Sequence, residues 1–168
     1  MAETPQQYQQ RMLGNADGHE PRKVQAATAG RLEKLLRGAT RAKLSKRPAP
    51  DKWSISEIVA HLAEAEIVVG YRMRVILGAP GSPIQAFDQD KWAAEGKYGA
   101  RDAKKSLALF RALREANIEW LKSLSPQQRK AFGMHSERGQ ESIEFIERMM
   151  AGHDVNHIRQ IEAILARK

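Results

Sequence analysis

Two histidines near the C-terminus have a spacing that suits metal chemistry. His153 and His157 are four residues apart in Gly152-His-Asp-Val-Asn-His157. Residues four apart lie one above the other on a helix, so both imidazoles can reach one ion. By itself this short spacing does not separate a metal site from two core histidines that hydrogen-bond to polar neighbours.

The helix that carries this pair is predicted over residues 140–166. Its apolar positions recur every three or four residues, and both histidines fall on that stripe. The stripe consists of Ile143, Ile146, Met150, His153, His157, Ile161 and Ile164. Two stacked imidazoles on an apolar face need partners for their ring nitrogens. A metal ion meets that need because it takes a lone pair from each ring.

A third histidine, His61, lies on a second predicted helix with a well-marked start. Ser54-Ile-Ser-Glu57 is a capping box, and Trp53 and Ile58 occupy the two positions of a hydrophobic staple. His61 lies at the edge of the apolar stripe, about 60° round from Ile58. Alone it is typical of a boundary histidine. Together the three imidazoles favour a shared site that leaves metal positions open to water or substrate.

The remaining sequence predicts further helices and no convincing strand. Residues 21–37 and 102–123 carry helical apolar stripes, and a short helix is predicted over residues 5–14. The fold class is therefore all-α, a four-helix bundle. We expect one domain over residues 1–168, with residues 1–20 as a short N-terminal helical extension.

The segment 78–101 is rich in glycine and proline, which predicts a loop. It also carries Phe87, Trp92 and Tyr98. Long loops with aromatic residues often cover sites.

Composition excludes several classes of function. There are no cysteines, so disulfides, thiolate ligands and a cysteine nucleophile are excluded. The sequence contains no serine nucleophile elbow, P-loop or dinucleotide fingerprint. None of the five histidines has a glutamate three residues before it, which argues against a di-iron bundle.

The net charge of +8 is concentrated in the first 50 residues and in the basic segment 37–52. A solvated loop and an anion-binding loop both fit this segment. No aromatic interleaving or nucleic-acid motif accompanies it, so we expect no nucleic-acid partner. The N-terminus is polar, and no apolar run approaches the ~20 residues of a membrane span. We therefore expect a cytoplasmic protein without a membrane partner.

The sequence resembles the DinB/YfiT-like family from about residue 20 to the end. The resemblance is carried by Trp53-Ser-Ile-Ser-Glu-Ile-Val-Ala-His-Leu-Ala-Glu-Ala-Glu66 and by Ala151-Gly-His-Asp-Val-Asn-His-Ile-Arg-Gln160. The segments Tyr71-Arg-Met-Arg74, Phe87-Asp-Gln-Asp90 and Gly133-Met-His-Ser-Glu-Arg-Gly139 are similar to a subgroup of the family.

This resemblance implies a four-helix bundle of up-down-down-up connectivity, which is often a homodimer. It implies one divalent metal ion per chain, with nickel or zinc as the usual occupant. His61, His153 and His157 match the positions of the family's three ligands. The activities assigned within the family are transfer with low-molecular-weight thiols, isomerisation of thiol adducts, and hydrolysis.

The leading hypothesis is a metal-dependent hydrolase or thiol S-transferase acting on a small-molecule substrate. Its metal would activate water or a low-molecular-weight thiol. Four further residues are candidates for the pocket, namely Asp154, Gln160, Arg72 and His135. Asp154 and Gln160 would support the site or line its mouth, or else be solvated helix residues. Arg72 would recognise an anionic substrate, or else form a structural ion pair.

His135 would reach the open end of the bundle, or else form a loop hydrogen bond. The alternative function is a non-catalytic, metal-stabilised binding or stress-associated protein.

Overall fold

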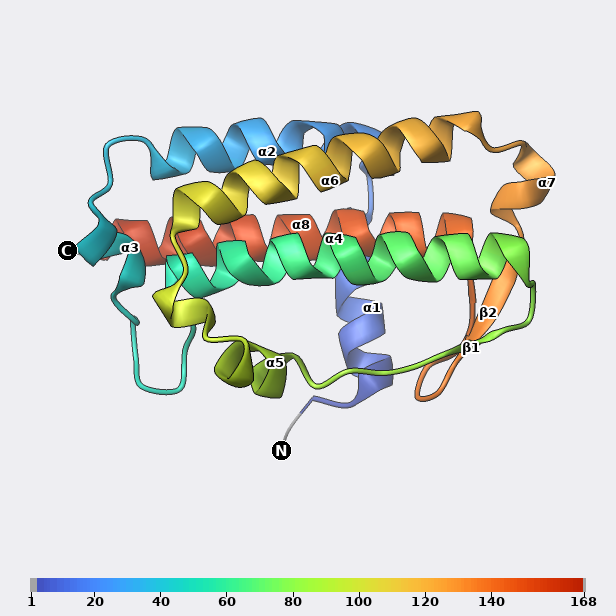
Figure 1. The fold of residues 1–168 in the computed structure, drawn as a ribbon, viewed down its shortest axis with the longest axis horizontal. Coiled ribbons are helices and arrows are strands. Elements are labelled where there is room, and N and C mark those ends of the chain that lie inside the picture. The colour runs from blue at the N-terminus through green and yellow to red at the C-terminus, as the bar shows by residue number, and fades with distance from the viewer. Residues whose placement is uncertain (1–2, 168) are drawn as a thin grey trace.

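Four long helices run side by side along the long axis of the molecule (Figure 1). In the computed structural model, which describes residues 3–167, they are α2 (Pro21–Leu36), α4 (Ile55–Gly78), α6 (Ala103–Ser123) and α8 (Ile143–Ala166). Helices α2 and α8 run in one direction, and α4 and α6 run in the other. This is the expected all-α four-helix bundle with up-down-down-up connectivity.

The parallel pair α4 and α6 explains the long connection between them. A chain that leaves one end of α4 must return along the whole bundle before α6 begins. Figure 1 shows this return path below the bundle, with the short helix α5 (Gln89–Glu95) on it. A 3₁₀ helix, η1 (Tyr98–Ala100), follows just before α6. Of the aromatic residues in this segment, Tyr98 is buried and Trp92 is exposed.

Side-chain caps determine where the long helices begin. The Ser54 hydroxyl accepts a hydrogen bond from the Glu57 N–H, and the Glu57 carboxylate accepts from the Ser54 N–H. This is the predicted capping box of α4. Ser142 caps α8 through the Phe145 N–H. Helix α8 therefore starts at Ile143, three residues after the predicted start at residue 140.

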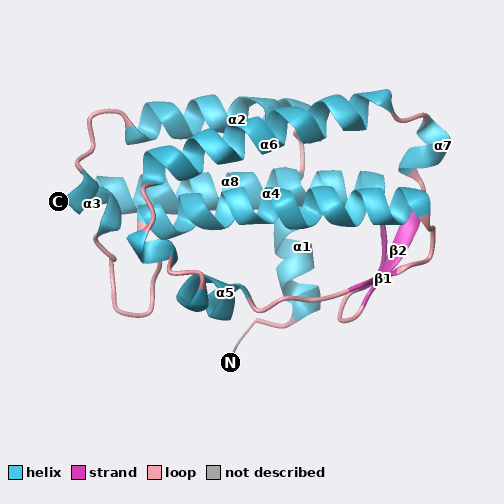
Figure 2. Cartoon of the chain, in the orientation of Figure 1, coloured by secondary structure: helices cyan, strands magenta, loops and turns pink. Residues whose placement is uncertain are grey.

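A small three-stranded sheet closes one end of the bundle (Figure 2). Strand β1 (Pro83–Ile84) pairs in parallel with β2 (Phe132–His135), which pairs antiparallel with β3 (Gly139–Ser142). The prediction of no strand was wrong here. Segments of two to four residues are too short to show the alternation that identifies a strand.

The short helices surround the bundle. They are α1 (Pro5–Ala16), α3 (Arg41–Ser45) and α7 (Pro126–Arg129). Helix α1 extends two residues beyond the predicted range and crosses α8 (Figure 1). At the crossing, a Cβ on Gly152 would lie 1.6 Å from the carbonyl oxygen of Met12. The glycine therefore allows the two helix backbones to touch beside His153.

The two larger apolar clusters of the core are separated by a polar layer, and a third, small cluster joins Ala60 of α4 to Ala93 and Tyr98 of the return path. One larger cluster includes Leu32, Ile58 and Ile161, and the other includes Ile76 and Ile146. Buried polar side chains of all four long helices lie between them, namely Gln25, Thr28, His61, Glu66, Arg114, Asn117, His153, Asp154 and His157. The polar layer holds the candidate site. Within residues 3–167, no helix is long and apolar enough to cross a membrane.

Candidate metal centre

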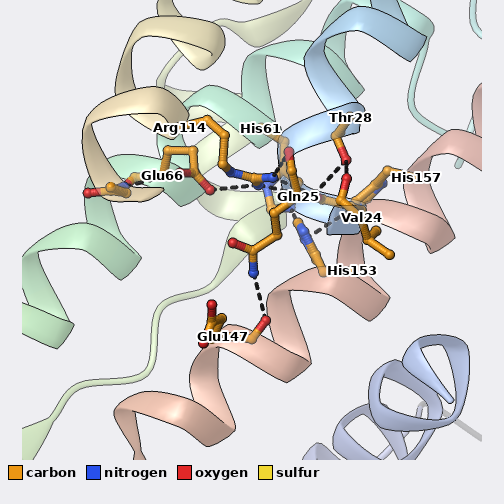
Figure 3. A network of polar contacts seen from close by, with 11 residues as sticks. Val24, Gln25, Thr28, His61, Glu66, Arg114, Glu147, His153 and His157 are labelled. Atoms are coloured by element: carbon orange, nitrogen blue, oxygen red, sulfur yellow. Dashed lines mark hydrogen bonds and ion pairs between the residues drawn. The ribbon is translucent and has the colours of Figure 1, made fainter. Parts of the chain in front are cut away.

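The structure brings His61, His153 and His157 together inside the bundle (Figure 3). His61 comes from α4, and the other two come from adjacent turns of α8. The Nε2 atom of His153 lies 3.0 Å from the Nε2 of His61 and 3.0 Å from the Nε2 of His157. Each of the three residues is at most 6% exposed.

Burial keeps these imidazoles neutral at neutral pH. It lowers the pKa of His61 and His153 well below the ordinary value, and the neighbouring imidazoles lower both further. It also lowers the pKa of His157, to about 4. Neutral rings keep a lone pair on one nitrogen, which is the form that binds metal.

The hydrogen bonds around the rings fit a bound cation. The Oε1 of Gln160 lies 2.7 Å from the Nδ1 of His157, which places the proton on Nδ1 and leaves Nε2 with a lone pair. The Nε2 of His153 faces two other ring nitrogens, and its buried Nδ1 has no hydrogen-bond partner within residues 3–167. Two nitrogens that share one tetrahedral zinc ion lie roughly 3.3 Å apart. The observed 3.0 Å separations are close to that value.

A buried ion-pair network lies beside the histidines. Arg114 of α6 bonds to Asp154 at 2.5 and 3.0 Å and to Glu66 at 2.8 Å. Burial alone would lower the pKa of Arg114, but the two carboxylates raise it above its ordinary value. Thr28 donates a further hydrogen bond of 2.9 Å to Asp154. Asp154 is therefore engaged inside the core and does not line the mouth of the site.

A cleft of about 430 Å³ leads from His157 to the surface. Gln160 is among the residues that line it. Trp53 forms another part of the wall, with its ring centroid 4.9 Å from that of His61. Tyr8 and Arg11 of α1 also line the cleft.

Arg72 and His135 lie outside the histidine cluster and share a second cleft of about 380 Å³. Arg72 donates to the carbonyl oxygen of Gln85 and lies 5.4 Å from the ring centroid of Phe87. Of the two roles left open for Arg72, the structural ion pair is not formed within the described residues, 3–167. His135 makes a loop hydrogen bond, in which its Nδ1 accepts from the Glu137 N–H at 3.2 Å.

Sequence reasoning missed several residues of the site. Arg114 and Asn117 interrupt the apolar stripe of residues 102–123, and that signal was available. Tyr8 and Arg11 had no comparable signal, because only the docking of α1 brings them to the cleft.

In the basic segment 37–52, Arg47 pairs with Glu57, while Arg41, Lys43, Lys46 and Lys52 are exposed.

The fold and the histidine cluster define a class of helical bundles with a candidate metal site between α4 and α8. Residues 26–161 match the family model of the DinB superfamily. The chain belongs to this superfamily.

Two curated relatives from Oceanobacillus iheyensis both bear the name "Putative metal-dependent hydrolase". One is 23% identical over 89% of this chain and 86% of its own length. The other is 26% identical over 69% of this chain and 67% of its own length.

Two solved structures share the fold. YfiT from Bacillus subtilis, described as "a probable metal-dependent hydrolase with an unusual four-helix bundle topology", superposes with a TM-score of 0.79 and 20% identity. The match covers 97% of this chain and 88% of YfiT. A mycothiol-dependent maleylpyruvate isomerase gives a TM-score of 0.65 and 12% identity, over 84% of this chain and 59% of the isomerase.

Proposed function

We propose that this protein is a metal-dependent enzyme whose His61, His153 and His157 bind one divalent cation. The observation that carries the proposal is the convergence of three buried, neutral imidazoles, with two Nε2–Nε2 separations of 3.0 Å. Core histidines satisfied by polar neighbours would turn their ring nitrogens toward conventional partners, whereas the Nε2 of His153 faces only the Nε2 atoms of His61 and His157. A ligand set of three nitrogens suits zinc or nickel.

The bound cation would supply Lewis acidity that lowers the pKa of water or a thiol to near neutrality. The chain supplies the arrangement around it. Gln160 holds the His157 ring by its Nδ1, and Trp53 packs against His61. The first cleft, at about 430 Å³, falls in the size range of small-molecule sites.

We infer that the nucleophile is water or a low-molecular-weight thiol and that the substrate is a small molecule. The names of the two Oceanobacillus relatives support hydrolysis. The mycothiol dependence of the structurally similar isomerase supports a thiol. These alternatives predict different products from one electrophilic substrate.

The first test is metal content. Protein purified from metal-supplemented cells is expected to contain about one nickel or zinc ion per chain by mass spectrometry. His153→Ala is expected to lose the metal while its circular dichroism stays helical. His19→Ala, at an exposed position, is the matched control and is expected to keep it. Metal-free wild-type protein from metal-replete cells would refute the site.

The second test separates the reactions. The metal-loaded protein is incubated with electrophilic esters and epoxides, with and without a low-molecular-weight thiol, and products are identified by mass. Turnover that requires His157 and the thiol establishes transfer, and turnover without thiol establishes hydrolysis. Bound metal without turnover would instead indicate the non-catalytic, metal-stabilised binding protein.

We further infer a homodimer that pairs through α4. Ile67 and Tyr71 are one helical turn apart on this helix and are 46% and 68% exposed. Apolar side chains exposed together on one helix face are typical of a protein–protein interface.

A further inference from the structure

The second cleft lies beside the first and shares part of its wall. Both are lined by Glu3, which precedes α1, by Tyr8 of α1 and by Gln89 at the start of α5. The second cleft extends from there toward the sheet, where Arg72, His135 and Arg138 line it. A small molecule that enters one cleft therefore meets side chains that also border the other.

Arg72 carries a charge without an acidic partner. Its guanidinium contacts a backbone carbonyl and an aromatic face, but no carboxylate within residues 3–167 forms an ion pair with it. Burial, together with the neighbouring Arg138, lowers the pKa of Arg72 to about 10. The side chain stays charged at neutral pH. An anion would relieve the cost of holding this charge in a partly buried position.

His135, which also lines the second cleft, carries an unused hydrogen-bond donor. The residue is only 3% exposed. Because its Nδ1 accepts from the Glu137 N–H, the proton of the neutral ring lies on Nε2. This Nε2 is buried and has no partner within residues 3–167. Burial and the charge of Arg138 lower the pKa of His135, which keeps the ring neutral.

The acidic residues of the second cleft form no ion pair or hydrogen bond with Arg72 or with the Nε2–H of His135 within residues 3–167. Glu3 pairs with Arg11 at 2.7 and 2.8 Å. Asp88 accepts hydrogen bonds from the N–H groups of Asp90 and Lys91 at the start of α5. Glu137 is exposed to solvent.

Arg138 is already satisfied by Glu141, at 2.6 and 3.2 Å. Within residues 3–167, the Arg72 guanidinium is therefore left without a carboxylate partner and the Nε2–H of His135 without an acceptor.

We propose that the second cleft is a carboxylate-binding subsite, in which Arg72 and the Nε2–H of His135 hold the carboxylate of a small organic acid. A guanidinium presents paired N–H groups to both oxygens of a carboxylate, which gives direction as well as charge. The role of this carboxylate as one end of the enzyme's substrate rests on the proposed function. The binding itself requires only the residues of the second cleft.

The test is a titration of full-length, chelator-treated protein with glutarate, followed by ¹H–¹⁵N NMR. Saturable shifts are expected at the amides of residues 84–87 and 135–138. Arg72→Gln is expected to weaken binding at least about tenfold, since it removes a charge-assisted bidentate contact. Arg31→Gln removes the same charge at an exposed position outside both clefts and is expected to bind like wild type.

Arg72→Lys keeps the positive charge but loses the paired N–H groups of the guanidinium. Its affinity for glutarate is therefore expected to fall between those of wild type and Arg72→Gln. This variant decides the question if Arg72→Gln fails to fold. No saturable binding, or equal affinity in wild type and both Arg72 variants, would overturn the subsite. So would shifts of the metal-free protein that centre on residues 153–160 instead of on residues 84–87 and 135–138. Metal analysis tests the proposed function separately, because the titration uses metal-free protein.

Discussion

At the scale of single residues, the histidine cluster is stable only while its rings are neutral. Each imidazole is almost completely buried, and no carboxylate contacts any of the three within residues 3–167. A proton added to a ring therefore places an uncompensated charge in the core. The same burial that prepares the lone pairs for metal makes the metal-free protein sensitive to acid.

We predict that the metal-free protein loses stability as the pH falls from about 6.5 to about 4. The folded state lowers the pKa of His157 from 6.5 to about 4, so the unfolded chain binds more protons in this window. The stabilisation is complete above pH 6.5 and is lost progressively toward pH 4. His157 alone contributes about 3 kcal/mol at most. Urea unfolding of the wild type and of His157→Gln across this pH range measures the free energy of unfolding at each pH.

The pH dependence is expected to be weaker in His157→Gln, because glutamine does not titrate. His61 and His153 titrate in the same direction and keep part of the effect. Identical pH profiles for both proteins would contradict the assignment to His157.

We predict that Arg114→Leu destabilises the protein by about 3–5 kcal/mol, since it leaves Asp154 and Glu66 buried without their cation. Arg111→Leu is the matched control, three residues earlier on α6. Its ion pair with Glu33 is exposed, so the expected loss is below about 1 kcal/mol. Chemical denaturation compares the two. Equal losses would show that the buried network contributes no more than a surface pair.

The burial of the two histidines on α8 could be predicted from the sequence more readily than the neighbours that each candidate residue meets. His153 and His157 replace apolar residues on a long regular helix, so their burial could be expected. Arg72 and His135 were grouped with the same pocket, although they lie in a second cleft. Spacing along one helix gives the direction of a side chain, but the partner that it meets depends on the packing of other elements.

At the scale of elements, the position of α1 depends on one glycine. Helix α1 forms a wall of both clefts through Tyr8. It is held against α8 by polar contacts such as Arg11 with Asn156, and by the close approach at Gly152. A side chain at position 152 would separate the two helices.

We predict that Gly152→Ala displaces α1 and destabilises the protein by about 1–3 kcal/mol, because its Cβ would overlap the Met12 carbonyl. Limited proteolysis is expected to cut the region before residue 21 faster. Gly30→Ala is the control in the interior of α2, where no atom lies within 4 Å of the added Cβ. It is expected to stabilise by about 0.5–1 kcal/mol. Equal stability and equal proteolysis rates of Gly152→Ala and Gly30→Ala would show that Gly152 is not needed for the packing of α1 on α8.

Elements were predictable where local chemistry determines them. The capping box at Ser54 and the first-turn prolines at Pro5 and Pro21 gave helix starts close to the observed ones. The hairpin of β2 and β3 was missed because its strands are only four residues long, and β1 was missed because Pro83 pairs with Met134, fifty-one positions away in the sequence. Such pairing depends on the bundle that brings the segments together, so local pattern carries no signal for it.

At the scale of the whole molecule, we predict a dimer of about twice the 18.9 kDa chain mass by light scattering. Tyr71→Glu is expected to shift it toward the monomer, since it buries a charge in the inferred α4 interface. Ala27→Glu adds the same charge at an exposed position of α2 and is expected to leave the dimer intact. A monomeric wild type, or a Tyr71→Glu dimer of unchanged affinity, would exclude pairing through this face.

The return path between α4 and α6 divides the chain into two halves joined by one long connection. The first half, with α2 and α4, carries His61, and the second half, with α6 and α8, carries His153 and His157. Helix α4 packs on α6 and on α8, and α2 packs on the same two helices, so the histidine cluster forms only when the two halves pack together. If two chains exchanged halves through an extended connection, each pair of exchanged halves would form the same cluster from two polypeptides. An exchange of this kind would leave the metal content per chain unchanged.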